Sequence, residues 1–237
     1  MEDIGQLAYF CKYGHLMKAQ ELLQAKPDLL DISDDALHVA CENGHVDIVQ
    51  YLLDIWKETG KWEEIEEQKW VYFVSVCRNG HLQVVKFLIE FFNLNISINN
   101  DYALCVACEN GHLEVVKYLF QINPSIKISG LTFATTCRNN GLEVVKYLLQ
   151  NPESISSSKY YDSIMDFENA LLYACGHGHL EVVKCLFQAK PHLNMNEAFR
   201  CACLFGHVNV AKWFASINPS KYVMVVKNGR IVSYIVM

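Results

Sequence analysis

The sequence predicts an all-α repeat solenoid of about seven stacked helix-turn-helix units, followed by a short C-terminal β-hairpin that caps the stack. Three observations lead to this fold class. The dipeptide Gly-His recurs six times, a cysteine stands three residues before each of these glycines, and an apolar pattern with helical spacing follows each histidine. A unit of this kind cannot bury its apolar faces alone, so neighbouring units must stack.

The landmark positions, six glycines and Asn140, give the repeat period, because they follow one another at intervals of 30, 36, 31, 29, 38 and 28 residues. The fifth copy, CRNNGLEVVKYLL, is degenerate, since Asn140 stands at the glycine position and Gly141 at the histidine position. Free cysteine packs as a small hydrophobe, and thiols inside cells stay reduced. We therefore expect structural packing, without disulfide or redox chemistry, at the seven register cysteines: Cys11, Cys41, Cys77, Cys108, Cys137, Cys175 and Cys203.

Each copy divides into an inner helix before the landmark and an outer helix after it. Outer segments such as LEVVKYLF place apolar residues on one broad face, and pairs such as Glu114 and Lys117 lie on the polar face. We expect a single domain over residues 1–237. Its repeats should span approximately residues 1–30, 31–66, 67–97, 98–127, 128–164, 165–193 and 194–218, with the hairpin at 219–237.

The C-terminal segment carries a hairpin signal. Asn228 and Gly229 separate two β-branched runs and suit a two-residue type I′ turn, so strands are expected at Tyr222 to Lys227 and Arg230 to Val236. A hairpin here would cover the apolar surface that the last repeat leaves open, as terminal caps must do. The alternative is a strand edge that pairs with a partner.

The segment LHVACENGHVDIVQYLL, residues 37–53, resembles the LHxAAxxGHxxVVxxLL core of ankyrin repeats. The resemblance covers nearly the whole chain, although the Thr-Pro that usually opens the first helix is absent. We therefore expect tight turns between repeats in place of regular β-hairpin fingers. The register ACENGHLEVVKYL is also similar to ankyrin-repeat proteins of giant DNA viruses that infect amoebae, which implies a viral protein that engages a host factor.

The family resemblance implies that a protein partner binds the concave face, formed by the inner helices, and the inter-repeat loops. Carried over to the positions before each landmark, it gives candidate contacts at Tyr13, Glu42, Arg78, Glu109, Arg138, His177 and Phe205. Four of them, Glu42, Arg78, Glu109 and Arg138, alternate in charge. They form either a ladder that binds a partner or surface pairs that screen one another. Leu204 and Phe205 are apolar at normally exposed positions, so we expect burial under the hairpin, with a contact site as the alternative.

Two long segments interrupt the repeats. Residues 54–70 place Trp56, Trp62 and Trp70 among glutamates. Either the outer helix is extended and the aromatic side chains pack on its neighbour, which we favour, or Trp62 and Trp70 anchor a partner in a contact loop. The Ser-rich segment 150–169 is expected to be a surface connector, and contact through Tyr160 and Tyr161 is the alternative.

Catalytic chemistry finds no support in the sequence. Six of the nine histidines follow a landmark glycine, where we expect the imidazole to tie the loop to neighbouring backbone. Cys105 and Cys108 form a CxxC without a second ligand pair, and phosphate-loop, GxGxxG and GxSxG motifs are absent from the sequence. The sequence therefore predicts no catalytic residues, no cofactor, no metal and no enzymatic activity.

Charge and hydropathy narrow the partners further. The net charge is −6 without a basic stripe, and no uncharged apolar run approaches the roughly 20 residues that cross a bilayer. Nucleic acid and membrane partners are disfavoured, and without a signal sequence we expect an intracellular, cytoplasmic protein, in the host cytoplasm if viral. The predicted function is a monomeric protein-protein interaction module, and the alternative is a self-associating structural component.

Overall fold

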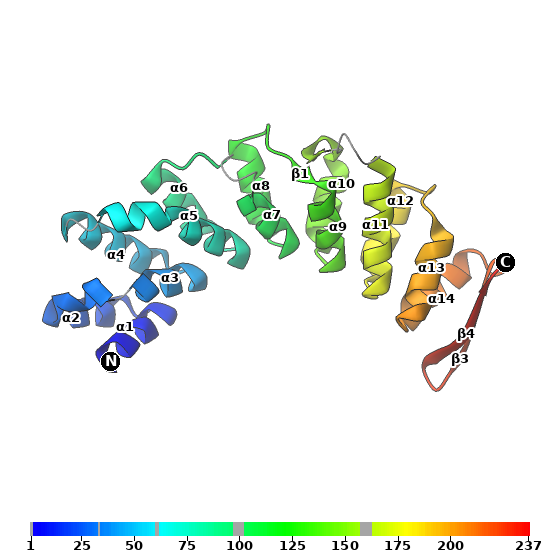
Figure 1. The fold of residues 1–237 in the computed structure, drawn as a ribbon, viewed down its shortest axis with the longest axis horizontal. Coiled ribbons are helices and arrows are strands. Elements are labelled where there is room, and N and C mark those ends of the chain that lie inside the picture. The colour runs from blue at the N-terminus through cyan, green and yellow to red at the C-terminus, as the bar shows by residue number, and fades with distance from the viewer. Residues whose placement is uncertain (1, 33, 60–61, 97–101, 157–162) are drawn as a thin grey trace. The chain divides into compact units, whose positions relative to one another are not determined.

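The computed structural model describes residues 2–32, 34–59, 62–96, 102–156 and 163–237 (Figure 1). The described residues form seven helix pairs, which confirms an all-α repeat solenoid. The pairs are α1 (Glu2–Lys12) with α2 (Leu16–Ala25), α3 (Asp34–Asn43) with α4 (Val46–Thr59), α5 (Trp62–Asn79) with α6 (Leu82–Phe92), α7 (Tyr102–Glu109) with α8 (Leu113–Ile122), α9 (Gly130–Arg138) with α10 (Leu142–Gln150), α11 (Ser163–Gly176) with α12 (Leu180–Ala189), and α13 (Met195–Leu204) with α14 (Val208–Ile217).

Contacts divide the chain into two units. The first comprises residues 1–107 and 117–123, and the second comprises residues 108–116 and 124–237. In the first unit the inner helices α1, α3 and α5 pack in sequence, and each also packs on its own outer helix (Figure 1). In the second unit α9, α11 and α13 repeat this arrangement, with α10, α12 and α14 on their outer side. The core of each unit is therefore the surface between successive helix pairs.

All seven register cysteines lie in these cores. Burial raises the pKa of the Cys11 thiol to about 12 and that of Cys203 to about 11, and it also raises the pKa of Cys41, Cys77, Cys137 and Cys175. These six thiols are therefore protonated at neutral pH and pack as small apolar groups, as the repeat register indicates.

The landmark glycine ends each inner helix. Its φ lies near +75°, for example +78° at Gly44, where a side chain would be strained. The amide of the following residue, His45, then donates to the carbonyl of Ala40, and the amide of Gly44 donates to that of Cys41. These are the two hydrogen bonds of a Schellman motif, which satisfies carbonyls at the helix end. The glycine is thus required by the helix stop.

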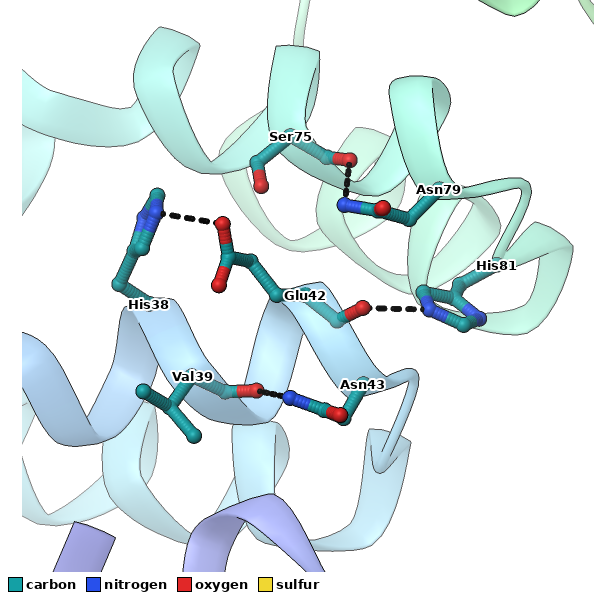
Figure 2. Close-up of polar contacts among 7 residues, drawn as sticks. All are labelled: His38, Val39, Glu42, Asn43, Ser75, Asn79 and His81. Atoms are coloured by element: carbon teal, nitrogen blue, oxygen red, sulfur yellow. Dashed lines mark hydrogen bonds and ion pairs between the residues drawn. The ribbon is translucent and has the colours of Figure 1, made fainter. Parts of the chain in front are cut away.

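Landmark histidines such as His45 and His81 join their repeat to the one before it. In Figure 2 the Nε2 atom of His81 lies 2.7 Å from the carbonyl oxygen of Glu42, and His45 makes the same contact with Lys12 at 2.9 Å. A carbonyl only accepts, so Nε2 carries the proton. The equivalent bonds, from His179 to Arg138 and from His207 to Gly176, are both 2.8 Å. The expectation that these imidazoles tie the loops to neighbouring backbone is confirmed.

The degenerate fifth copy keeps this geometry with different residues. Asn140 takes the landmark conformation at φ +63°, which asparagine tolerates better than most residues. A Cβ at Gly141 would lie 2.8 Å from Cγ2 of Thr136, so this site has no room for the usual histidine. Instead, the side-chain amide of Asn139 donates to the carbonyl of Glu109 at 2.9 Å, the acceptor position that histidines use elsewhere. Asn139 therefore replaces the missing inter-repeat hydrogen bond.

The first long segment is helical. Helix α4 continues to Thr59 and α5 begins at Trp62, ahead of residue 66, where the second repeat was expected to end. Trp56 is fully buried, in agreement with an extended outer helix whose aromatic side chain packs inward. The Trp62 side chain and residues 157–162, with Tyr160 and Tyr161 of the Ser-rich segment, lie outside the described residues.

The strands of the described residues form two pairs. Strands β3 (Tyr222–Lys227) and β4 (Arg230–Val236) pair antiparallel, with a bulge at Val232 opposite Val225 and Val226, so the predicted hairpin is confirmed. Tyr222 is buried with its ring 5.0 Å from that of Phe199 and 5.8 Å from that of Phe214. A parallel pair of two-residue strands, β1 (Ile128–Ser129) with β2 (Ile155–Ser156), was not anticipated from the sequence.

We predict that Asn139→Ala lowers the free energy of unfolding by about 1 kcal/mol, the usual net value of one hydrogen bond. Asn43→Ala is the matched control, because Asn43 occupies the same repeat position but donates to Val39 of its own helix. Asn139→Ala loses a bond between repeats and Asn43→Ala loses a bond within one helix, so the difference between the variants compares the two kinds of bond. Urea denaturation measures both, and equal stabilities would contradict the assigned role.

Candidate functional site

A groove on the inner helices of the first unit brings together predicted contact residues. It encloses about 360 Å³, and we call it the inner groove. Its walls come from α3, α5 and the first turn of α7, and its lining residues are His38, Glu42, Trp70, Val71, Val74, Ser75, Arg78 and Tyr102. Three residues predicted from the sequence, Glu42, Trp70 and Arg78, therefore meet in one site.

The two charged side chains of the inner groove are exposed and hydrogen-bonded. Glu42 lies one helical turn after His38, and its Oε1 is 3.1 Å from the His38 Nε2 atom (Figure 2). Arg78 donates from Nη2 to the phenol oxygen of Tyr102 at 3.3 Å. These contacts orient one acid and one base on neighbouring inner helices.

The rest of the inner groove is largely apolar. Trp70 is half-buried, with its ring edge-on to Phe73 at 5.7 Å. Val71 is 57% exposed and Tyr102 is 48% exposed, so both side chains present apolar surface to solvent. The carbonyl of Ser75, another lining residue, accepts from the Asn79 side chain (Figure 2). An exposed apolar strip beside two opposite charges can bind a partner's side chains by burial and by ion pairing.

Sequence reasoning missed Val71 and Tyr102, although a signal for them exists. Each stands six residues before a register cysteine, at a position that faces solvent. Leu131 occupies the same position in the second unit and is 67% exposed. Apolar residues at this position of the repeat can therefore be recognised as candidate contacts once the register is known.

The other predicted residues do not line the inner groove. Tyr13 is exposed at the end of α1, with its ring 4.7 Å from that of Tyr9. In the second unit Arg138 donates from Nε to the Nε2 atom of His177 at 3.3 Å, and the backbone of Glu109 accepts from Asn139. The charge ladder through all four alternating residues stays a prediction.

Burial of Leu204 and Phe205 was the wrong expectation, since their side chains are 70% and 66% exposed. Tyr222 of the hairpin packs on Phe199, which lies earlier in α13, and on Phe214 of the outer helix α14. Leu204 and Phe205 stand at the last turn of α13, on its solvent side. The alternative, that they form a contact site, stays a prediction.

One inter-repeat histidine has a perturbed pKa. Burial lowers the pKa of His179 below 6.5, its backbone bond to Arg138 opposes this shift, and the positive forms of His177 and His207 lower it further. The folded protein therefore holds His179 as the neutral imidazole more strongly than the unfolded chain does.

We predict that acid weakens the fold through His179. Because the folded pKa is below the unfolded value of 6.5, the unfolded state binds the proton first as the pH falls. The free energy of unfolding should then not depend on His179 well above pH 6.5 and should decline as the pH falls below that value. His179→Gln keeps an amide donor for Arg138 but does not titrate, so chemical denaturation between about pH 8 and about pH 5 should show a shallower decline. Parallel curves for both proteins would contradict this assignment.

Within the described ranges, no three His, Cys, Asp or Glu side chains converge as a metal site would require. No helix in that same part of the chain is long and apolar enough to span a membrane.

These features define a class of protein, a stack of helical hairpins whose inner helices line a groove. The chain belongs to the ankyrin-repeat family. Residues 63–130 and 131–223 match a profile described as ankyrin repeats in three copies, and residues 7–53 match one described as ankyrin repeats in many copies. Such repeats are generally protein-protein interaction modules. Comparison with curated proteins gave no match.

Proposed function

We propose that this chain is a non-enzymatic, monomeric module that binds a protein partner through its inner helices and inter-repeat loops. The observation that carries this proposal is the inner groove, where Val71 and Tyr102 are exposed beside Glu42 and Arg78. Apolar side chains that gather at a groove with polar residues around it are typical of interaction sites, and aromatic residues with arginine dominate binding energy at interfaces.

Further contact residues are proposed in each unit. Tyr13, Glu42, Trp70 and Arg78 contribute from the first unit, with Trp62 at the start of α5. Glu109, Arg138, His177 and Phe205 contribute from the second unit. The similarity to repeat proteins of giant viruses leads us to propose a host protein as the partner and the host cytoplasm as the place of action.

We predict that Val71→Glu abolishes capture of the partner. A charge in the centre of an interface costs about 2 kcal/mol or more, which is some thirtyfold in affinity. Met17→Glu is the matched control, because Met17 is also an exposed apolar side chain but lies on the outer helix α2. Affinity capture from amoebal lysate, read by mass spectrometry, should retain one protein on wild type and on the control, and lose it on Val71→Glu. Equal retention on all three would place the contact elsewhere.

Self-association is the alternative function, and two exposed apolar features support this alternative. Val232 and Ile235 on strand β4 are exposed, as are Leu204 and Phe205 on α13. An exposed strand edge or an apolar patch can pair with a second copy.

We predict a single-chain mass of 27.1 kDa in light scattering at every concentration up to about 100 μM. A mass that grows with concentration would favour the assembly component. Phe205→Glu and Val232→Lys, each made separately, would then locate the contact on α13 or on the hairpin.

A further inference from the structure

The inner groove has a charge arrangement that favours one class of binding segment. Glu42 and Arg78 occupy the same repeat position on α3 and α5, each directly after its register cysteine. They carry opposite charges, and both line the groove that also contains the apolar side chains of Val71 and Val74. A ligand for this site must therefore satisfy an acid, a base and an apolar strip together.

We propose that the inner groove binds an extended peptide segment in which an apolar residue stands between a basic and an acidic residue. This inference rests on the proposed function, since it names the class of partner for the same groove. The basic residue pairs with Glu42, the acidic residue pairs with Arg78, and the apolar side chain packs on Val71, Trp70 and Tyr102.

Spacing sets the length of the segment. Neighbouring packed helices lie about 8 to 10 Å apart, and an extended chain rises about 3.3 Å per residue. In an extended chain alternate side chains face the same way, so the basic, apolar and acidic residues of the ligand should stand at alternate positions. The two charged residues are then four positions, about 13 Å, apart, and long charged side chains can close the difference from the helix spacing. At about 360 Å³, the groove is at the lower end of ligand-pocket sizes, so it takes a few side chains.

The two ends of the groove differ in the group that they recognise. The Arg78 guanidinium is planar and already hydrogen-bonded to Tyr102 at 3.3 Å, and such a fork matches the two oxygens of a carboxylate. The Glu42 carboxylate is oriented by His38 at 3.1 Å and accepts from lysine or arginine. Held side chains lose less conformational freedom on binding than free ones do.

Charge also provides discrimination against other segments. A wholly apolar segment would remove water from Glu42 and Arg78 without replacing those hydrogen bonds. A segment with two like charges would place one of them against its own sign at either end of the groove. The preferred ligand is therefore locally neutral, even though the net charge of −6 would attract basic partners at long range.

Peptide selection tests the charge rule directly. Displayed random peptides of about ten residues, long enough to cross several helices, are selected on wild type, Arg78→Glu, Glu42→Arg and Lys12→Glu. Lys12→Glu is the matched control, because Lys12 holds the same repeat position on α1 but does not line the inner groove. Circular dichroism and thermal melting establish that all four proteins are folded.

Wild type and the control should enrich peptides that carry one basic and one acidic residue around an apolar residue. Arg78→Glu should enrich peptides with two basic residues, and Glu42→Arg should enrich peptides with two acidic residues. A synthetic peptide selected on wild type should bind Arg78→Glu about tenfold more weakly, because an attraction becomes a repulsion. These shifts do not depend on the direction in which the peptide lies.

Enrichment of the same charge pattern on all four proteins would overturn the inference, and so would no enrichment on wild type. Failure of the broader function gives a different result. If capture of a folded partner is lost on Val71→Glu while selected peptides show no charge rule, protein binding at the inner groove stands and only the charge rule fails.

Discussion

The contact between one repeat and the next is the constraint on which the rest of the structure depends. A single helical hairpin leaves both of its faces open, so stability is a sum over these contacts. Most of that stability comes from apolar burial, since a buried leucine contributes about 1.5 to 3 kcal/mol and one hydrogen bond about 1 kcal/mol. Burial is not directional, however. The bond from a landmark imidazole to the preceding repeat, as from His81 to Glu42, sets the register in which the helices pack.

This division of roles explains why recognition and stability use different atoms of the same residues. Glu42 offers its backbone carbonyl to His81 and its side chain to the inner groove. The carbonyl is present whatever the side chain is, so the side chain at this position can change without loss of the inter-repeat bond. At the same position the second unit has Gly176, whose carbonyl accepts from His207, and Leu204, which is exposed. The surface therefore changes from charged to apolar over an unchanged scaffold.

Local signals were sufficient to predict most of the fold. The register cysteines are buried and the turn at Asn228 and Gly229 joins the two strands, both as predicted. These features could be predicted because each signal depends on a few adjacent residues. The positions of Leu204 and Phe205 were not predictable in this way. Their exposure depends on which face of α13 the hairpin covers, and that is decided by the packing of Tyr222 on residues distant in sequence.

The inner groove was only partly predicted for the same reason. Glu42 and Arg78 follow from the register, whereas their meeting with Tyr102 depends on the packing of three helices.

The degenerate fifth copy shows what the fold selects. A sequence comparison would place a defect here, since both landmark residues have changed. The structure contains none, because Asn140 supplies the positive φ and Asn139 supplies the donor to Glu109. At Gly141, beside Thr136, a histidine would have no space, so the two changes belong together. The fold therefore requires a residue with positive φ at the end of the inner helix and a hydrogen-bond donor that faces the carbonyl of the preceding repeat. Residues that meet both conditions can form the repeat.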